Sequence, residues 1–283
     1  MFMKYIIHDY MIKYLLFLLL SYSIHGLKML NPHTISCKME TEKQLITVAP
    51  AGKYGYYQLG ICHYIKQHYD LTNYIFSGAS AGAWNSLFMT YNKNDNRFIK
   101  QLLQIDTRNI EKIIELELQL KDKIIKKYST RDFDLEKLYI GAITINNTDI
   151  TTEIYNDFID LSDALDCCIA SSHIPIMSGS ILNFYKNKIT IDGGFVKDPY
   201  IKNKKSTLHI TPTLWNKEEP YIGLNFKVLN MIKKNEYKLL IDQLKGFLDV
   251  SDINPTKLYK KGYSDTYKNR EKLDILFNKK YGK

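Results

Sequence analysis

The sequence predicts an α/β fold, with a mainly parallel central sheet and helices on both of its faces. Short apolar segments typical of strands alternate with amphipathic segments typical of helices along most of the 283 residues. Three of the predicted strands, which end at Ala49, Ser77 and Ile191, lead directly into loops rich in small residues. Because sites gather at the carboxyl ends of strands in such sheets, we expect these three loops to share one edge of the sheet.

The start of the chain differs from the rest. Lys4 and Lys13 precede a run of about eleven apolar residues that starts at Tyr14 and weakens by Ile24. A basic start before such a run is typical of a secretory signal peptide, whereas a membrane-spanning helix needs about twenty apolar residues. We therefore interpret residues 1–28 as a signal peptide, or as an uncleaved signal-anchor if residues from Tyr5 onward join the span. Either interpretation predicts a protein that is secreted or is associated with a membrane through this segment.

The net charge of +9 is compatible with an anionic membrane surface or with nucleic acid as a partner. Ile, Lys, Asn and Tyr are all abundant, however, and A/T-rich codons encode these four residue types, so codon bias also accounts for the basic surface. No RNP, zinc-finger or basic-zipper pattern is present, and we expect no nucleic-acid partner. Metal-ligand spacings, a Walker loop and a dinucleotide fingerprint are also missing from the sequence, so we expect no metal and no cofactor.

Six short segments rich in β-branched and aromatic residues predict strands. They are residues 45–49, 74–77, 138–144, 152–155, 188–191 and 208–211. Helices are predicted where apolar residues recur at the spacing of one helix face, namely in residues 56–69, 81–91, 97–128 with a break near 106–109, 161–171, and stretches past Phe226.

Particular side chains give these predicted helices their apolar faces. In the second piece of 97–128, the expected core-facing stripe consists of Ile113, Leu116, Leu120 and Ile124. Past Phe226, the residues available to cover the sheet are Leu229, Ile232, Leu240, Leu244 and Phe247. Gly60 lies inside the first predicted helix, where glycine is unfavourable, so we expect another part of the chain to pack closely against it.

The sequence Gly-Ala-Ser-Ala-Gly at residues 78–82 lies between a predicted strand and a predicted helix. It is the G-x-S-x-G pattern of a nucleophile elbow, in which small flanking residues such as Gly78 and Gly82 relieve the cramped backbone of the serine. Such a turn presents Ser80 at the N-terminus of the following helix, where free N–H groups favour developing negative charge. The alternative is a small-residue turn at which a helix packs closely on the sheet.

A serine nucleophile needs a base that accepts its proton. Asp192 is the candidate, because it follows a predicted strand and precedes Gly193 and Gly194, which leave its carboxylate unshielded. Taken alone, an aspartate before glycine more often opens a turn than acts as a catalyst.

The reaction also needs hydrogen-bond donors that stabilise an oxyanion. Residues 50–55 form a loop next to the first predicted strand, with consecutive backbone N–H groups at the start of a helix. The candidate donors are the amides of Gly52, Lys53 and Tyr54. The alternative is an ordinary connection between a strand and a helix.

The chain resembles the patatin-like phospholipases, most closely the animal branch that includes adiponutrin and adipose triglyceride lipase. That family has a glycine-rich G-x-G-x-x-G loop, then G-x-S-x-G, then D-G-G or D-G-A. The matching segments here are residues 50–55, which end at Gly55, residues 78–82, and residues 192–194. Weaker similarities lie at residues 56–60, 171–175 and 262–265.

The resemblance implies a patatin-like fold, a modified form of the α/β-hydrolase type. A catalytic core would cover residues 44–205, and a C-terminal strand and helices in residues 206–283 would pack on the same domain. The implied activity is that of a lipid acyl hydrolase, a phospholipase or acylglycerol lipase, that uses a Ser80–Asp192 dyad without histidine and forms an acyl-serine intermediate. Its implied substrate is a lipid ester, and a membrane surface is the expected partner.

Two departures from the family pattern keep other interpretations open. Pro50 replaces the first glycine and lacks an N–H, and Tyr54 replaces the usual basic residue before the last glycine. Both favour a weakly active or inactive protein that binds lipid or membrane. The remaining alternative is a conventional α/β-hydrolase with a Ser–Asp–His triad, which would require His209, the only histidine after Asp192.

Overall fold

The computed structural model describes residues 43–105, 107, 110, 112–146, 149–175, 177–196, 198–215 and 253–277. The predicted leader at residues 1–28 and the predicted sheet-covering residues from Leu229 to Phe247 lie outside this part of the chain. No helix within the described part is long and apolar enough to cross a bilayer.

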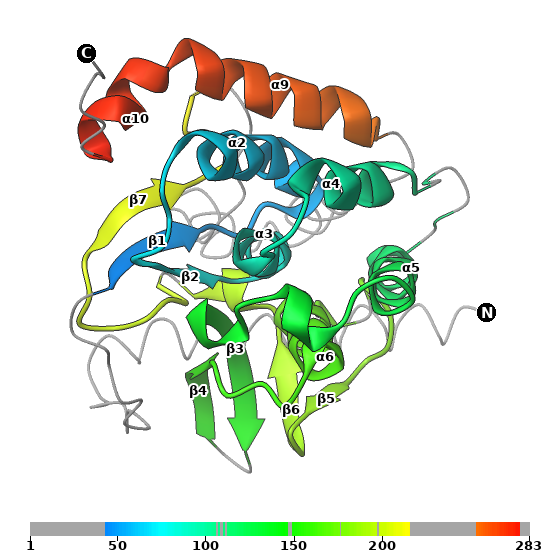
Figure 1. Ribbon diagram of the computed structural model, residues 1–283. Helices are drawn as coiled ribbons and strands as arrows, with labels where there is room; N and C mark the ends of the chain where they lie inside the picture. Colours follow the sequence, from blue (N-terminus) through cyan, green and yellow to red (C-terminus); the bar gives the residue numbers. More distant parts are fainter. Residues whose placement is uncertain are drawn as a thin grey trace, which may run out of the picture.

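The centre of the molecule is a seven-stranded sheet (Figure 1). Its strands are β1 (Gln44–Val48), β2 (Tyr74–Gly78), β3 (Leu138–Asn146), β4 (Asp149–Tyr155), β5 (Asn183–Tyr185), β6 (Lys188–Ile191) and β7 (Ser206–Ile210). The order is β5-β6-β3-β2-β1-β7, and β4 pairs with β3. Strands β7, β1, β2 and β3 are parallel, whereas β4 and β6 run antiparallel to β3, and β5 runs antiparallel to β6. The sheet is therefore mixed but mostly parallel, as predicted, with β4 and β6 as the two reversed strands.

β2 and β6 lie along the same edge of β3 and approach each other from opposite ends. β4 follows the other edge of β3 from Ile140 to Asn146. On the edge opposite β4, β2 pairs with the first part of β3, up to Gly78 opposite Ile140. β6 pairs with the later part of the same edge and ends with Ile191 opposite Ile143. The carboxyl ends of β2 and β6 consequently face each other across a short gap.

The predicted strands all occur, with shifts of a few residues at their ends, and β5 was not predicted. The expectation that three parallel strand ends share one edge is wrong for the strand that ends at Ile191, because β6 is antiparallel to its neighbour β3. The carboxyl end of β6 still lies close to the carboxyl end of β2, since β3 is long enough to pair with β2 and β6 in succession.

The described helices are α2 (Gly55–His68), α3 (Ala81–Thr90), α4 (Asp95–Leu103), α5 (Ile113–Ile125), α6 (Leu161–Ser171), α9 (Pro255–Lys268) and α10 (Arg270–Leu276). Several begin at side chains that satisfy free N–H groups of the first turn. Asn94 caps α4, Asp160 caps α6, and Asn254 caps α9.

The main core lies between the sheet and these helices. Alternate strand residues, including Ile46, Val48, Phe76 and Ile140, point into it, as the two-residue period of a strand requires. All the described helices contribute to this one core, so helices cover one face of the sheet within the described residues (Figure 1). The second face carries a smaller apolar cluster around Ile143 and Ile191. Helices on that second face stay a prediction.

α9 packs along α2, which joins the C-terminal part of the chain to the same core (Figure 1). Two glycines permit this close approach. A Cβ atom added at Gly60 would lie 2.2 Å from the Tyr259 carbonyl oxygen, and one added at Gly262 would lie 2.0 Å from that of Tyr57. The close packing expected against Gly60 is thus confirmed, and the partner is α9.

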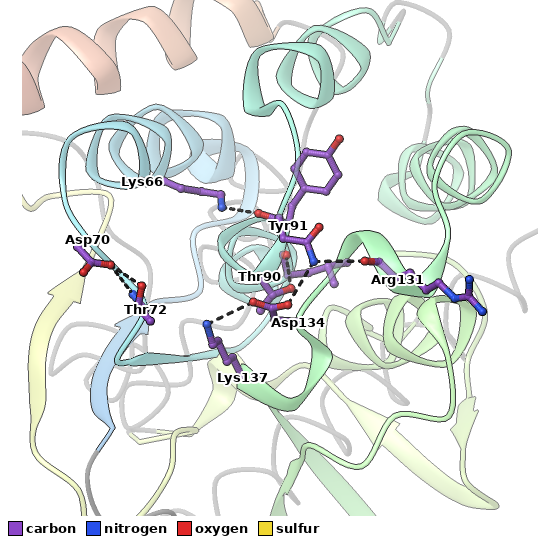
Figure 2. A network of polar contacts seen from close by, with 10 residues as sticks. Lys66, Asp70, Thr72, Thr90, Tyr91, Arg131, Asp134 and Lys137 are labelled. Atoms are coloured by element: carbon purple, nitrogen blue, oxygen red, sulfur yellow. Dashed lines mark hydrogen bonds and ion pairs between the residues drawn. The ribbon is translucent and has the colours of Figure 1, made fainter.

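A polar network fixes the C-terminal end of α3 (Figure 2). The carbonyl oxygens of Thr90 and Tyr91 accept hydrogen bonds from Asp134 N–H and from the Lys66 ammonium, respectively. Asp134 also pairs with Lys137 at 3.3 Å, just before β3. The last carbonyls of a helix lack partners within it, so this network satisfies them and holds α3 against α2 and β3.

Replacing Gly262 by alanine should destabilise the protein by about 1–3 kcal/mol, because the added Cβ collides with the backbone of α2. In an exposed helix the same change would stabilise by up to about 1 kcal/mol, so the sign of the effect reports the packing. Denaturant-induced unfolding measures it. The exposed Ser264→Ala on the same helix is the control, with an expected change below about 0.5 kcal/mol. A stabilising Gly262→Ala would contradict the close approach.

Candidate active site

Ser80 lies at the turn between β2 and α3. Its backbone φ of 55° and ψ of −132° are angles that a residue with a side chain rarely adopts. A Cβ atom added at Gly78 would lie 2.2 Å from the Gly82 carbonyl oxygen, and one added at Gly82 would lie 2.1 Å from that of Val48. The turn therefore requires both glycines, and it holds Ser80 in one strained conformation.

The Ser80 and Asp192 side chains are in direct contact. Ser80 Oγ donates a hydrogen bond to Asp192 Oδ2 at 2.8 Å, and Asp192 Oδ1 accepts the N–H of Gly194 at 2.5 Å. The Asp192 N–H donates to the His173 carbonyl oxygen at 2.7 Å. Ser80 is 7% exposed and Asp192 is 4% exposed. The two residues singled out by the sequence thus meet in a largely buried site.

The antiparallel course of β6 explains how residues 112 positions apart come together. β2 ends at Gly78, opposite Ile140 of β3, and β6 ends at Ile191, opposite Ile143. Ser80 and Asp192 each follow within two residues of these facing strand ends. Gly193, which comes next, packs against β3 so closely that a Cβ atom there would lie 2.5 Å from the Gly141 carbonyl oxygen.

Ser171, at the end of α6, connects the elbow to β3. Its Oγ accepts the Ser80 N–H at 2.8 Å and donates to the Gly141 carbonyl oxygen at 2.7 Å. The Ser80 N–H is therefore already bonded and is not a free donor. No role for Ser171 was predicted. Nothing in its spacing indicates a contact with a residue 91 positions away.

The loop before α2 supplies two free backbone donors. Residues Gly52–Tyr54 form a 3₁₀ turn, and Gly52 has a φ of 48°. Within the described part of the chain, the N–H groups of Gly52 and Lys53 have no acceptor, and both residues line the same cavity as Ser80. The Tyr54 N–H donates to the Ala51 carbonyl oxygen at 3.0 Å. Of the three amides predicted to form an oxyanion hole, Gly52 and Lys53 are free to do so and Tyr54 is occupied.

Side chains from two helices hold this loop in place. Gln58 Nε2 of α2 donates to the Ala49 carbonyl oxygen at 2.9 Å, and Asn85 Nδ2 of α3 donates to that of Gly55 at 3.0 Å. Pro50 packs against the loop that follows Asp192, because a Cβ atom at Gly194 would lie 3.0 Å from Pro50 Cβ. Pro50 thus lies against the loop that follows Asp192, and it donates no hydrogen bond because proline has no N–H.

Burial raises the pKa of Asp192 to about 6, and the hydrogen bonds from Gly194 and Ser80 partly offset this effect. The carboxylate is therefore ionised at neutral pH and can accept a proton from Ser80. Ser80 itself is the residue before α3, so the positive end of that helix dipole lies at the position where negative charge would develop.

Ser80, Gly52 and Lys53 open onto an apolar cavity of about 100 Å³. A single water molecule needs about 10–15 Å³ when volume is counted as the space open to the centre of a water-sized sphere. The cavity therefore has room for a chain of several carbons. The aliphatic and aromatic wall includes Leu87, Phe98, Leu102, Leu116, Leu120 and Ile124. The stripe of α5 that was predicted to face a core lines this cavity.

Glu117 is a carboxyl group in the wall of the apolar cavity. It is 4% exposed, and its Oε1 accepts a hydrogen bond from the Trp84 indole N–H at 3.2 Å. Burial raises its pKa to about 8, the nearby Ser172 hydroxyl and the Trp84 N–H partly offset this effect, and the negative charge of Asp192 adds to it. Glu117 was not among the predicted site residues, although its position four residues after Ile113 and three before Leu120 places it on the apolar face of the helix.

His209 lies apart from the dyad. Its Nδ1 is 2.8 Å from Thr47 Oγ1 on the neighbouring strand β1, whereas both carboxyl oxygens of Asp192 have other partners. Among the described residues, no group of three His, Cys, Asp or Glu side chains is arranged to hold a metal ion.

No protein-family model and no curated protein matches this chain.

Glu117→Gln should change how stability depends on pH. A raised pKa in the folded protein means that the folded state holds the Glu117 proton more tightly than the unfolded state. Stability from this group is thus fully present below about pH 4.5 and is lost as the pH rises through about 8. Glutamine cannot ionise, so the variant should gain on the order of a few kcal/mol over the wild type between pH 5 and pH 9.

Denaturant unfolding of both proteins across this pH range measures the difference. Asp122→Asn, at an exposed position of the same helix, is the control and should show no such trend. A difference between wild type and Glu117→Gln that is constant with pH would contradict the burial of a protonated carboxyl.

Proposed function

We propose that this protein is a lipid acyl hydrolase, a phospholipase or acylglycerol lipase of the patatin-like type. The hydrogen bond from Ser80 Oγ to Asp192 Oδ2, 2.8 Å long and at one end of an apolar cavity, carries the proposal. A serine held in a strained elbow against a buried carboxylate is an arrangement that nucleophilic catalysis requires. The resemblance in the three loops points the same way.

In the proposed reaction, Asp192 takes the proton of Ser80 while Oγ attacks the ester carbonyl carbon. The carbonyl oxygen becomes an oxyanion, which the free N–H groups of Gly52 and Lys53 are placed to bind. The tetrahedral intermediate collapses, the alcohol leaves with the proton from Asp192, and the acyl group stays on Ser80. Water then loses a proton to Asp192 and attacks the acyl-serine. The bond between the acyl carbon and Ser80 Oγ breaks, Oγ takes the proton back from Asp192, and the carboxylic acid and the free enzyme are released.

The surroundings of Ser80 favour a lipid ester as the substrate. The wall of the cavity is made mainly of aliphatic and aromatic side chains, which suit an acyl chain. The net charge of +9 suits an anionic bilayer surface. We further propose that the apolar segment in residues 1–28 directs the protein to the secretory route or holds it at a membrane.

The main alternative is a protein that binds lipid and turns it over slowly or not at all. It is favoured by Pro50, which has no N–H, and by the Tyr54 N–H, which is bonded to Ala51. Only the N–H groups of Gly52 and Lys53 then remain, among the amides considered in this loop, to stabilise the oxyanion. This alternative predicts lipid binding that does not depend on the Ser80 hydroxyl.

Ser80→Ala and Asp192→Asn should each lower kcat/KM for a fluorogenic acyl ester by at least about a hundredfold, the expected cost of losing a nucleophile or its base. The purified full-length protein and the two variants are compared in one assay, with circular dichroism as a check on folding. If neither change lowers the rate by this amount, the dyad is not the catalyst.

His209→Ala is the control that separates a dyad from a triad. Because His209 contacts Thr47 and not Asp192, this variant should keep most of the activity. A loss comparable to that of Asp192→Asn would favour a Ser–Asp–His enzyme instead.

The rate should fall on the acid side of an apparent pKa near 6. Asp192 must be ionised to accept the Ser80 proton, and its pKa is about 6. Activity is therefore lost as the pH falls through this value, with kcat/KM at pH 5 about tenfold below its plateau. A pH–rate profile from pH 4.5 to 8 tests this, and an unchanged rate from pH 5 to pH 7 would exclude Asp192 as the base.

A further inference from the structure

Glu117 has no part in the proposed reaction, yet it lies in the cavity that the substrate would occupy. It belongs to the face of α5 that points to the cavity, between Ile113 and Leu120. The other α5 residues that line the cavity are all aliphatic. A buried carboxyl in such a wall is costly unless a partner satisfies it.

The two carboxyl oxygens of Glu117 differ in their partners. Oε1 accepts the Trp84 indole N–H at 3.2 Å, whereas Oε2 is buried and has no hydrogen-bond partner among the described residues. Ser172 also lines the cavity, and its Oγ donates a hydrogen bond to the Cys168 carbonyl oxygen at 2.9 Å. Trp84 thus satisfies Oε1. The Ser172 hydroxyl is close enough to lower the pKa of Glu117, but within the described residues Oε2 has no hydrogen-bond partner.

Glu117 lines the same cavity as Ser80. Asp192 is close enough to act on its charge, and Ser172 follows Ser171, whose hydroxyl binds the Ser80 N–H. Trp84 stands one turn into the helix that begins after Ser80. An ester bound at Ser80 would therefore bring the atoms nearest its carbonyl group to Glu117.

We propose that Glu117 binds a hydroxyl group of the substrate, located within a few bonds of the ester that Ser80 attacks. This proposal rests on the proposed function, since it assumes that an ester occupies the cavity. The enzyme would then select hydroxyl-bearing lipid esters over esters that have only hydrocarbon near the carbonyl group. Without the hydroxyl, the free oxygen of Glu117 would be buried against apolar atoms, which penalises the plain ester.

A hydroxyl group suits this position better than a cation. It can accept a hydrogen bond from a neutral carboxyl and can donate one to a carboxylate, so it pairs with Glu117 in either state. A bound ammonium group would have to be stripped of water and buried among leucine and isoleucine side chains, and it would need the ionised carboxyl that this environment disfavours.

Two kinds of lipid ester carry such a hydroxyl. One is an acyl chain hydroxylated near its carboxyl end, and the other is a partial glyceride, whose alcohol keeps a free hydroxyl beside the ester. Two substrate pairs distinguish them. The first pair is p-nitrophenyl 3-hydroxydecanoate and p-nitrophenyl decanoate, and the second is 1-monodecanoylglycerol and propyl decanoate.

The experiment measures kcat/KM of the full chain for each pair. For one pair, the wild type should favour the hydroxylated member by about tenfold or more, the effect of one hydrogen bond in a buried site. Glu117→Leu should bring this ratio close to one, and Glu117→Gln, which keeps a hydrogen-bonding group, should retain part of it. Gln119→Leu, at an exposed position of the same helix, is the matched control and should keep the wild-type ratio.

A wild-type ratio near one for both pairs would overturn the proposal. So would a ratio that Glu117→Leu leaves unchanged, because the preference would then have another source. A ratio that falls equally in Glu117→Leu and Gln119→Leu would indicate a general disturbance of α5 and would also overturn it.

Binding separates this proposal from the proposed function. Ser80→Ala protein is titrated calorimetrically with 3-hydroxydecanoate, decanoate, 1-monodecanoylglycerol and propyl decanoate. One hydroxylated ligand should bind about tenfold more tightly than its partner, and the Ser80→Ala, Glu117→Leu double variant should lose this difference. If the wild type hydrolyses no ester but this preference is present, the hydrolase proposal fails and the role of Glu117 stands. If esters are hydrolysed but no preference for a hydroxylated ligand is present, the hydrolase proposal stands and the role of Glu117 fails.

Discussion

The hydrogen bond between Ser80 and Asp192 joins the ends of two strands that meet head to head along one edge of β3. Neither β2 nor β6 alone would specify where its loop points. β3 sets the separation of the two strand ends, since both pair with it in succession. Ser171 then binds the elbow to β3 at Gly141, so the backbone of the serine is fixed to the same strand that fixes the position of the aspartate. A shift in the register of either strand would separate the two side chains.

Two carboxyl groups in this site have different environments and therefore different protonation. Asp192 keeps hydrogen bonds to both of its oxygens, and its pKa rises only to about 6. Glu117 accepts one hydrogen bond, from Trp84, and burial raises its pKa to about 8 although Trp84 and the nearby Ser172 hydroxyl lower it. At neutral pH the first is ionised and the second is neutral, and each state favours the other because two nearby negative charges repel. A neutral Glu117 leaves Asp192 as the negative group beside Ser80, which is the state a proton acceptor requires.

The strands, most helices and the Ser80–Asp192 pair could be predicted from the sequence because their signals are local. A small-residue turn after an apolar run, or an aspartate before two glycines, is readable within a few residues. The antiparallel course of β6 was not readable, since the direction of a strand depends on its partner and β5 is only three residues long. Ser171 and Glu117 were missed for a related reason. Their roles come from contacts with Ser80 and Trp84, at distances along the chain that no spacing rule reveals. The stripe around Glu117 faces the core, as predicted, but the sequence does not indicate that it also lines a cavity.

The loop that begins at Pro50 has free N–H groups that could stabilise an oxyanion, although proline itself has none. The positive φ of Gly52 turns the chain into a 3₁₀ turn that leads directly into α2, and the N–H groups of Gly52 and Lys53 have no acceptor within the described residues. α3 begins immediately after Ser80. The N-terminal ends of two helices thus lie on the side of Ser80 that faces the cavity, where each favours negative charge. The Asp192 carboxylate, the negative group, accepts hydrogen bonds from the Ser80 hydroxyl and from the N–H of Gly194 in its own loop. A substrate carbonyl that enters from the cavity would therefore develop its charge beside free N–H groups, while the proton moves toward the carboxylate, and this separation of charge is what the strained elbow makes possible.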